Sequence, residues 1–232
     1  MTAGERGTRV VERTFENAMP TIVPAPRDSE AKLQHILLHA AQTFAEEGFE
    51  GTSMRDISRV TGVSLSGLYY YFESKQKLLY LIQYNTFNFI MERLQARLDT
   101  VNDPATRLRV FVQNHIEYFL SHPSEMKVLA HEEEALDPPL RDEVAAIKRR
   151  YYALAREILD GVAAEGLAPG IPPRVAVLSL FGMMNWVYKW HNPEIDPGAE
   201  ELTNGIVAIF LNGVLEEKAA LYATESRART GD

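Results

Sequence analysis

The sequence predicts an all-α protein: an N-terminal three-helix helix-turn-helix domain, then a larger helical domain, with about nine helices in total. Apolar residues recur at helical spacing from residue 30 onward, and no segment alternates as a strand does. Clusters of proline and glycine divide the rest of the chain into segments of helical length. The expected domains are an extension over residues 1–29, a helix-turn-helix domain over 30–76 and a second helical domain over 77–225.

The composition excludes several classes of protein. The chain has 232 residues, no cysteine and a formal net charge of −8. Without cysteine it has no disulfide framework and no thiolate metal site. Its acidity argues against charge-driven coating of nucleic acid, although a site-specific reader needs only a local set of donors. With no apolar run of ~18 residues and no signal-peptide core, we expect a cytoplasmic protein without a membrane partner.

Residues 1–29 are predicted to be a flexible extension. Arginines alternate with acidic residues there, and Pro20, Pro24 and Pro26 discourage regular structure. The alternative is an arm that touches DNA beside the first helix.

The first helix is predicted from residue 30. Its apolar stripe contains Leu33, Ile36, Leu37, Ala40, Ala41 and Phe44. Gly48 supplies a stop, and Phe49 can fold back on the last turn. Further breaks fall at 103–104, 122–123, 138–139, 169–173 and 193–198. We therefore expect a long helix from Ser74 to about Val101, followed by five more helical stretches.

The segment TSMRDISRVTGVSLSGLYYYFESKQKLL, residues 52–79, has the pattern of two short helices joined by a turn. Ser53 can cap the first helix, with Asp56 completing a variant capping box, and Gly62 permits a tight turn. Ser64 and Ser74 cap the next two helices. The residues expected to face inward are Ile57, Val60, Val63, Leu68 and Phe72. Such a pair forms a helix-turn-helix, whose second helix enters the major groove of DNA.

The second short helix has exposed residues that suit DNA. Ser66 and Gly67 are small enough for the backbone to approach the bases. Tyr69, Tyr70 and Tyr71 carry hydroxyls and flat rings that can contact DNA. Lys75 stands at a helix N-terminus, where amide donors also favour a phosphate. The alternative is a helix pair with a tyrosine-rich packing face, but the glycine turn, serine caps and lysine together argue against it.

The run GFEGTSMRDISRVTGVSLSGLYYYFESKQKLL resembles the N-terminal domain of TetR-family regulators. The resemblance implies a three-helix DNA-binding domain, a linking fourth helix and a larger ligand-binding domain that dimerises. It also implies which positions touch DNA: Arg55, Ser64, Ser66, Gly67, Tyr70, Tyr71 and Lys75. Thr52 and Ser53, which begin the first short helix, complete the predicted DNA-binding set.

The segment VAVLSLFGMMNWVY, residues 175–188, is apolar on all sides, which indicates a helix buried on all sides. One side can face its own core and the other a second copy of the chain. Gly205 and Gly213 would allow close approach of the last helix. The predicted dimer interface contains Val175, Leu178, Phe181, Leu202, Ile206, Phe210 and Gly213. An ordinary monomeric core is the alternative.

The segment GMMNWVYKWHNP, residues 182–193, resembles part of a TetR subset that responds to acyl-CoA thioesters, although many of those have tyrosine where His191 stands. Trp186 and Trp190 are four residues apart and are expected to share a helix face. The predicted ligand pocket contains His115, Met183, Met184, Trp186, Tyr188 and Trp190. These residues are also compatible with a simple core.

No pattern of an enzyme is present. The run from His131 to Glu134 lacks a second histidine at helical spacing, so it is no zinc motif and is expected to be a solvated helix face. No phosphate-binding glycine loop, nucleophile elbow or paired carboxylates occur, so we expect no catalysis, cofactor or metal.

The expected function is a repressor that binds palindromic operator DNA as a homodimer and is released by an acyl-CoA effector, in control of lipid or related acid catabolism. The alternatives are a sensor of another hydrophobic molecule, as in efflux regulation, or a helical ligand carrier that does not bind DNA.

Overall fold

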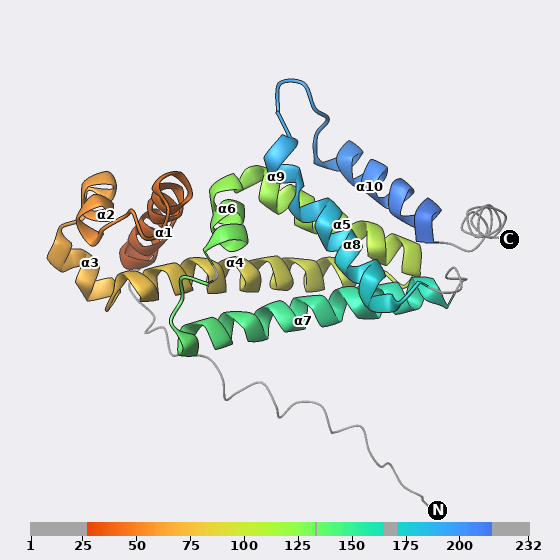
Figure 1. The fold of residues 1–232 in the computed structure, drawn as a ribbon, viewed down its shortest axis with the longest axis horizontal. Helices are drawn as coiled ribbons and strands as arrows, with labels where there is room; N and C mark the ends of the chain where they lie inside the picture. The colour runs from red at the N-terminus through yellow and green to blue at the C-terminus, as the bar shows by residue number, and fades with distance from the viewer. Residues whose placement is uncertain (1–26, 133, 165–170, 215–232) are drawn as a thin grey trace, which may run out of the picture.

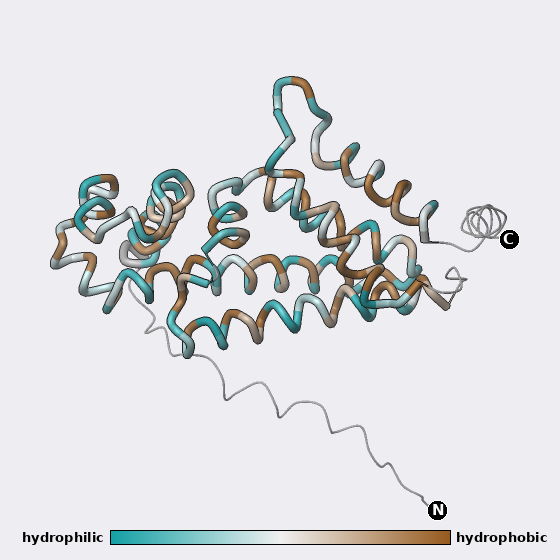
Figure 2. Tube along the Cα trace, in the orientation of Figure 1, coloured by the Kyte–Doolittle hydropathy of each residue, from teal (hydrophilic) through white to brown (hydrophobic). Residues whose placement is uncertain are grey.

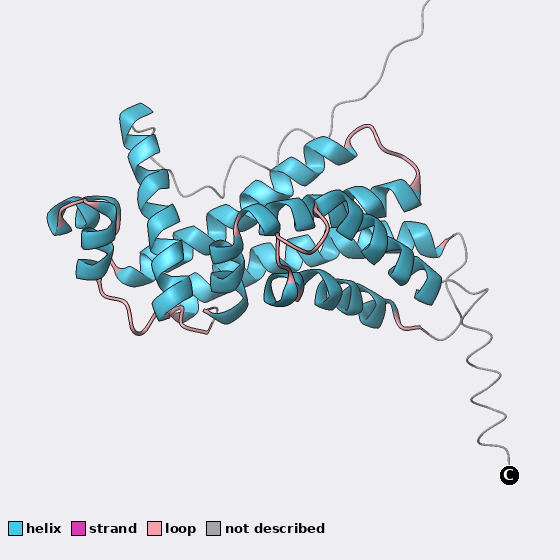
Figure 3. Ribbon diagram, turned by 90° about the horizontal axis from the view of Figure 1, so that it is seen from above, coloured by secondary structure: helices cyan, strands magenta, loops and turns pink. Residues whose placement is uncertain are grey.

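The structure, a computed structural model, describes residues 27–132, 134–164 and 171–214, and these residues form helices and loops with no strand (Figures 1 and 3). The all-α prediction is confirmed. The helices are α1 (Arg27–Glu47), α2 (Met54–Thr61), α3 (Leu65–Tyr71), α4 (Lys75–Leu98), α5 (Pro104–Ser121), α6 (Pro123–His131), α7 (Pro138–Ala163), α8 (Pro173–Asn185), α9 (Val187–Trp190) and α10 (Ala199–Val214). About nine were expected, and the extra one, α9, is a single turn.

The helices α1, α2 and α3 form one end of the molecule, and α4 extends from them into the remaining helices (Figure 1). The first helix begins at Arg27 rather than at residue 30, and the rest of the predicted extension, residues 1–26, lies outside the described residues. Gly48 ends α1 with a φ of 78°, and the Phe49 ring packs on Phe44 with ring centroids 5.3 Å apart. The predicted stop and the fold-back of Phe49 are both present.

Two hydrophobic cores meet along α4. The N-terminal core joins α1, α2, α3 and the first turns of α4 around Phe44, Ile57 and Leu68. It extends beyond residue 76, because Val128 from α6 and Val144 from α7 also belong to it. The N-terminal helices are therefore not an independent packing unit. We call the helices α1–α3 with the start of α4 the N-terminal unit.

The second core, which we call the C-terminal core, lies between the later turns of α4 and helices α5, α7, α8 and α10. Phe111 and Ile116 from α5 and Ile158 from α7 are almost fully buried in it. Both α8 and α10 pack on α5 and on each other, and both are rich in apolar residues (Figure 2). No helix in the described ranges is long and apolar enough to cross a membrane.

The helix predicted through residue 190 is broken near its end. The helix α8 stops at Asn185, Trp186 serves as its C-cap, and α9 is a separate turn. Trp186 and Trp190 therefore do not lie on one continuous helix, as the spacing had suggested.

Candidate nucleic-acid interface and C-terminal core

The start of α2 is fixed by the predicted capping box. The Ser53 hydroxyl oxygen accepts a hydrogen bond from the Asp56 N–H at 3.3 Å, and the Ser53 N–H donates to Asp56 Oδ2 at 3.0 Å. Arg59 pairs with the other carboxylate oxygen at 2.6 Å. Hydrogen bonds from the Ser53 side chain and backbone, with the nearby Arg59 guanidinium, hold the pKa of Asp56 below its ordinary value.

The turn between α2 and α3 requires two glycines for different reasons. Gly62 has a φ of 66°, as expected for the turn. A Cβ on Gly67 would lie 3.0 Å from Val63 Cγ1 and 3.1 Å from Ser64 Oγ. Ser64 caps α3 by accepting the Gly67 N–H at 3.1 Å. The small size of Gly67 thus serves packing against the turn, and its predicted approach to DNA stays a prediction.

Most of the predicted inward residues are buried: Ile57, Val63, Leu68 and Phe72. Val60 is exposed, so its prediction was wrong. The helix α2 has only eight residues and buries Met54, Ile57 and Thr61, which leaves Val60 outside this contact.

The outer face of α3 is polar and aromatic. Ser64, Ser66 and Tyr69 are exposed, and Tyr70 is 85% exposed. Tyr71 is only partly exposed: it packs against the N-terminal core and meets Tyr70 edge to face, with ring centroids 5.3 Å apart. The hydroxyls of Ser64 and Ser66 lie 3.2 Å from each other. This face projects at one end of the molecule (Figure 1).

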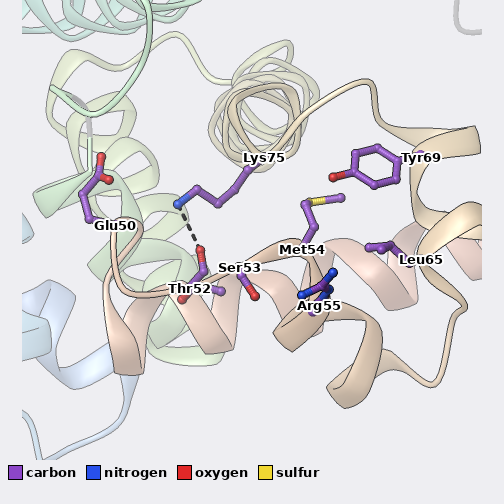
Figure 4. A pocket seen from close by; sticks show the side chains of 8 residues that line it. All are labelled: Glu50, Thr52, Ser53, Met54, Arg55, Leu65, Tyr69 and Lys75. Carbon is purple, nitrogen blue, oxygen red and sulfur yellow. Dashed lines mark hydrogen bonds between the residues drawn. The ribbon is translucent and has the colours of Figure 1, made fainter.

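A hollow of about 560 Å³ lies beside this face, between the start of α2 and the helices α3 and α4 (Figure 4). Its lining consists of Glu50, Thr52, Ser53, Met54, Arg55, Leu65, Tyr69 and Lys75. Arg55 is exposed and Lys75 partly exposed, so the lining carries two cations and one carboxylate, that of Glu50. Hydroxyls and cations at a helix N-terminus form a chemically suitable place for a phosphate.

Two predicted DNA-binding side chains have structural partners. The Lys75 ammonium donates hydrogen bonds to the carbonyls of Phe49 at 2.7 Å and Thr52 at 3.0 Å, and it lies 4.1 Å from the Phe49 ring centroid. Thr52 is buried and its hydroxyl donates to the Gly48 carbonyl at 2.8 Å. These side chains tie the α1–α2 loop to α4, a structural role that the sequence did not predict. Their predicted contact with DNA stays a prediction.

The N-terminal unit is hydrogen-bonded to the segment that follows α6. The Phe49 N–H donates to Glu132 Oε1 at 3.2 Å. Gln76 donates to the carbonyl of Ala135 at 2.7 Å and accepts the Asp137 N–H at 3.0 Å. Glu132 was expected on a solvated helix face, and its bond to Phe49 corrects that expectation. Sequence reasoning missed Gln76, because its partners lie 59 and 61 residues away along the chain.

The predicted pocket residues do not come together. Met184 and His115 are buried, whereas Met183 and Tyr188 are half-buried. Trp186 is 60% exposed and Trp190 is 48% exposed, so they do not line an interior cavity, which corrects the prediction. The break after Asn185 leaves Trp186 and Trp190 exposed, while Val187 between them is buried in the C-terminal core. Tyr188 instead lies with its hydroxyl 2.7 Å from His131 Nε2.

His115 lies in an aromatic part of the C-terminal core. Its Nδ1 is 3.2 Å from the Tyr151 hydroxyl, and the two rings are nearly parallel. Burial lowers the pKa of His115 to about 3, opposed in part by the Asn185 side chain, so the ring is neutral. Burial also raises the pKa of Tyr151. Sequence reasoning did not link Tyr151 to His115, because the two residues lie 36 positions apart along the chain.

The predicted dimer residues divide into two groups. Val175 and Leu178 on α8 are exposed, Phe181 is half-buried, and Gly213 on α10 is exposed. The three remaining residues, Leu202, Ile206 and Phe210, are buried in the C-terminal core of their own chain, so their assignment to a subunit interface was wrong.

The reason lies in the packing of α10 on α5. The apolar stripe of α10 covers α5, and Ala208 and Ile209 lie exposed outside this contact. Ile209 is 67% exposed, and a Cβ on Gly205 or Gly213 would meet nothing within 4 Å.

Among the residues that the structure describes, no group of three or more histidine or carboxylate side chains is arranged to hold a metal ion. The organised polar groups lie at the helix-turn-helix. A capped helix pair of this geometry, with a solvent-facing serine and tyrosine helix and a separate helical core behind it, defines a DNA-binding transcriptional regulator.

Comparison with known families agrees. Residues 36–80 match the family described as bacterial regulatory proteins, tetR family, and residues 101–214 match the tetracyclin repressor-like, C-terminal domain. The chain belongs to the TetR family of transcriptional regulators.

Individual relatives are distant in sequence, but the similarity to this chain extends over nearly their whole length. The HTH-type transcriptional repressor KstR2 of Mycolicibacterium smegmatis is 24% identical over 201 residues, which cover 85% of this chain and 98% of KstR2. A TetR-family regulator from Bordetella parapertussis superimposes with a TM-score of 0.72 at 28% identity, covering 78% of this chain and 94% of that one. AibR, crystallised with isovaleryl coenzyme A and operator DNA, gives a TM-score of 0.69 at 27% identity, covering 77% and 97%.

Proposed function

We propose that the chain represses transcription by binding a near-palindromic operator as a homodimer. The observation that carries this proposal is the outer face of α3, where Ser66 and Tyr70 are exposed beside the Ser64 cap. In a helix-turn-helix protein such a face enters the major groove, where hydroxyls and rings can meet base edges and thymine methyl groups.

The residues around the hollow beside α3 support separate roles in base recognition and phosphate binding. Arg55 and the capped start of α2 near Ser53 are suited to a phosphate on one side of the groove. The Tyr71 ring packs against the Tyr70 ring and supports its position. The hydrogen bond from Lys75 to the Thr52 carbonyl fixes the loop beside the hollow. Base recognition is therefore assigned to Ser66 and Tyr70, and phosphate binding to Arg55 and Ser53.

The test is a mobility-shift assay with the purified chain and DNA fragments from around its own gene, followed by footprinting of any fragment that is retarded. We expect one protected near-palindrome and competition by that sequence but not by scrambled DNA. A folded chain that retards none of these fragments would contradict the proposal.

The homodimer is proposed to form through the exposed faces of α8 and α10. Val175, Leu178 and Ile209 are large apolar residues exposed to solvent, and Gly205 leaves room for a partner helix. Contiguous exposed apolar surface is typical of subunit interfaces. Two recognition helices must fall about 34–36 Å apart, or a multiple of this. Sedimentation at micromolar concentration should give a dimer, and a monomer would contradict the assignment.

The effector is proposed to be an acyl-CoA that weakens operator binding. Its support is the likeness of residues 182–193 to acyl-CoA-responsive regulators and the isovaleryl coenzyme A in the AibR crystal. That crystal contains ligand and operator together, so in AibR the two are not mutually exclusive. For this chain we therefore expect a finite coupling of ~1–3 kcal/mol, roughly 5- to 150-fold in operator affinity.

Titration of the protein–operator complex with acyl-CoAs of several lengths, CoA alone and free fatty acids tests the effector. Release by acyl-CoAs only would support lipid or related acid catabolism as the regulated process. Release by unrelated hydrophobic compounds alone would replace it by a broad hydrophobic sensor.

A further inference from the structure

The interior of the C-terminal core holds a polar atom without a partner. His115 is 3% exposed, and its Nδ1 lies 3.2 Å from the Tyr151 hydroxyl. Its other ring nitrogen, Nε2, is buried and has no hydrogen-bond partner among the described residues. Because buried polar groups are almost always hydrogen-bonded, this atom has an unused bonding position.

Aromatic rings surround this atom. The centroid of Phe119 lies 4.5 Å from that of His115, and those of Tyr151 and Phe181 lie 6.1 Å and 6.3 Å away. Phe111 joins the group at 5.2 Å from Tyr151. Three phenylalanine rings, two from α5 and one from α8, thus surround the pair of His115 and Tyr151. Apolar walls with a single polar position are typical of sites for small organic ligands.

Neither His115 nor Tyr151 carries a positive charge that could neutralise a bound anion. Burial keeps the His115 ring neutral, with a pKa of about 3, and raises the pKa of the Tyr151 hydroxyl. A carboxylate placed here would be a buried charge without a cation, which is strongly unfavourable. A neutral carbonyl needs only one donor. The site chemistry therefore favours esters, thioesters, ketones or amides over free acids.

The buried ring is close to the molecular surface. The Asn185 side chain lies close enough to His115 to raise its pKa against the effect of burial, although it makes no hydrogen bond to Nε2. Asn185 is exposed at the end of α8, next to the exposed Trp186. A ligand whose acyl end enters here can leave a large polar remainder outside. This arrangement suits an acyl group that is attached to a bulky carrier.

We propose that His115 Nε2 donates a hydrogen bond to the neutral carbonyl of the effector, a thioester carbonyl in the case of an acyl-CoA. Tyr151 donates its hydroxyl proton to Nδ1 and so fixes the tautomer that places the ring proton on Nε2. His115 is the ligand-binding residue and Tyr151 the positioning residue. The inference rests on the proposed effector response and specifies the group of the ligand that is recognised.

The test compares matched ligands by calorimetric titration of the full chain. The probes are isovaleryl-CoA, the S-isoamyl-CoA thioether that lacks the carbonyl, methyl isovalerate and free isovalerate. The variants are His115→Phe and Tyr151→Phe. Tyr152→Phe, one residue along α7, is the matched control. Operator affinity without ligand and the melting temperature show whether each variant is folded.

The wild type and Tyr152→Phe should prefer thioester over thioether by about tenfold or more, the factor expected for one buried hydrogen bond. His115→Phe should lose this preference, and Tyr151→Phe should reduce it with operator affinity unchanged. If His115→Phe does not fold, Tyr151→Phe decides alone. Equal affinity of the wild type for thioether and thioester, or an unchanged preference in a folded His115→Phe or in Tyr151→Phe, would overturn the inference.

The same ligands and variants test the carbonyl site separately from the proposed acyl-CoA effector. Binding of methyl isovalerate over isovalerate, dependent on His115, with no binding of the CoA thioester, would reject acyl-CoA and retain the carbonyl site. Failure of both the ester and the thioester to bind would overturn the site, while operator binding would stand on the separate assay.

Discussion

The N-terminal unit and the rest of the molecule differ in how fully their polar side chains are hydrogen-bonded. In the N-terminal unit Ser53 is matched to Asp56, Ser64 to the Gly67 amide, and Lys75 to two loop carbonyls. The buried side-chain atoms without a partner in the described ranges are Gln83 Oε1 in the first half of α4, and Asn114 Oδ1 and His115 Nε2 in α5. Exposed large apolar residues also gather on α8 and α10, including Leu178 and Ile209.

The difference indicates how each half works. No buried side-chain polar atom of α1, α2 or α3 among the described residues lacks a hydrogen-bond partner, which favours a fixed position of α3. The C-terminal half has unused hydrogen-bonding and apolar surface, which a ligand and a second subunit can satisfy. Since a ligand shifts an equilibrium only through differential contacts, the half with unsatisfied groups is where the effector can act. The bonds of Glu132 and Gln76 then link that half to the N-terminal unit.

The largest effect is expected for Ile206→Glu. Ile206 is buried against α5, so the substitution places an unpaired carboxylate in the C-terminal core. We expect a loss of about 3–5 kcal/mol in the free energy of unfolding, measured by denaturant titration followed by circular dichroism. An unchanged unfolding midpoint would show that α10 does not pack on α5 in solution.

A substitution on the opposite face of α10 should disrupt the dimer rather than the fold. Ile209→Glu places a charge on a residue that is 67% exposed in the single chain, so the fold should persist while a dimer seam is disrupted. Sedimentation should give a helical monomer that binds the operator much more weakly, because two recognition helices are no longer linked. A stable Ile209→Glu dimer would exclude this face. Asn204→Asp, an exposed position of α10 whose side chain accepts a hydrogen bond from Arg109 on α5, is the control for added charge away from that face.

Local patterns predicted the N-terminal unit well. The three serine caps and the Gly62 turn are decided by neighbours within a few residues, so the sequence shows them directly. The partners of Lys75 lie 23 and 26 residues away, and no local pattern indicates them. The same holds for α10: its periodicity identified the apolar stripe, but only its packing decides whether that stripe covers α5 or a second subunit.

Within the N-terminal unit, the exposed and supporting tyrosines can be separated. Tyr70→Ala removes the side chain that is 85% exposed on α3, so operator affinity should fall by ~1–3 kcal/mol with the fold unchanged. Tyr71→Ala removes a ring that packs on the N-terminal core, so it should lower both operator affinity and stability. Fluorescence anisotropy with labelled operator measures the first effect, and thermal unfolding the second. The assignment of Tyr70 fails if its variant binds the operator as well as the wild type does.

A smaller effect is expected for Lys75→Met, which keeps an apolar stem but loses two hydrogen bonds to loop carbonyls. Because the site is partly exposed, we expect a loss of about 1–2 kcal/mol in the free energy of unfolding. Had Lys75 served only as a phosphate contact, stability would not change and only the salt dependence of operator binding would weaken. Denaturant unfolding, with operator affinity measured at two salt concentrations, distinguishes the two roles.

The smallest effect concerns the acid dependence of α2. Hydrogen bonds from Ser53, aided by Arg59, lower the pKa of Asp56 from its ordinary value of 3.8, so the folded state binds this proton less readily than the unfolded state does. The contribution to stability is therefore complete above pH 3.8 and is lost as the pH falls through the lower, folded-state pKa. Asp56→Asn removes this titration, and its stability should fall less steeply than that of the wild type as the pH is lowered below 3.8.

Asp103, which caps α5 in the other half and also has a lowered pKa, provides the matched control. Asp103→Asn should flatten the same pH profile but leave the hydrogen-exchange protection of α2 amides unchanged, whereas Asp56→Asn should reduce that protection. Equal protection of α2 in the two variants would mean that the capping box does not stabilise the helix-turn-helix locally, and that the contrast between the two halves does not extend to their helix caps.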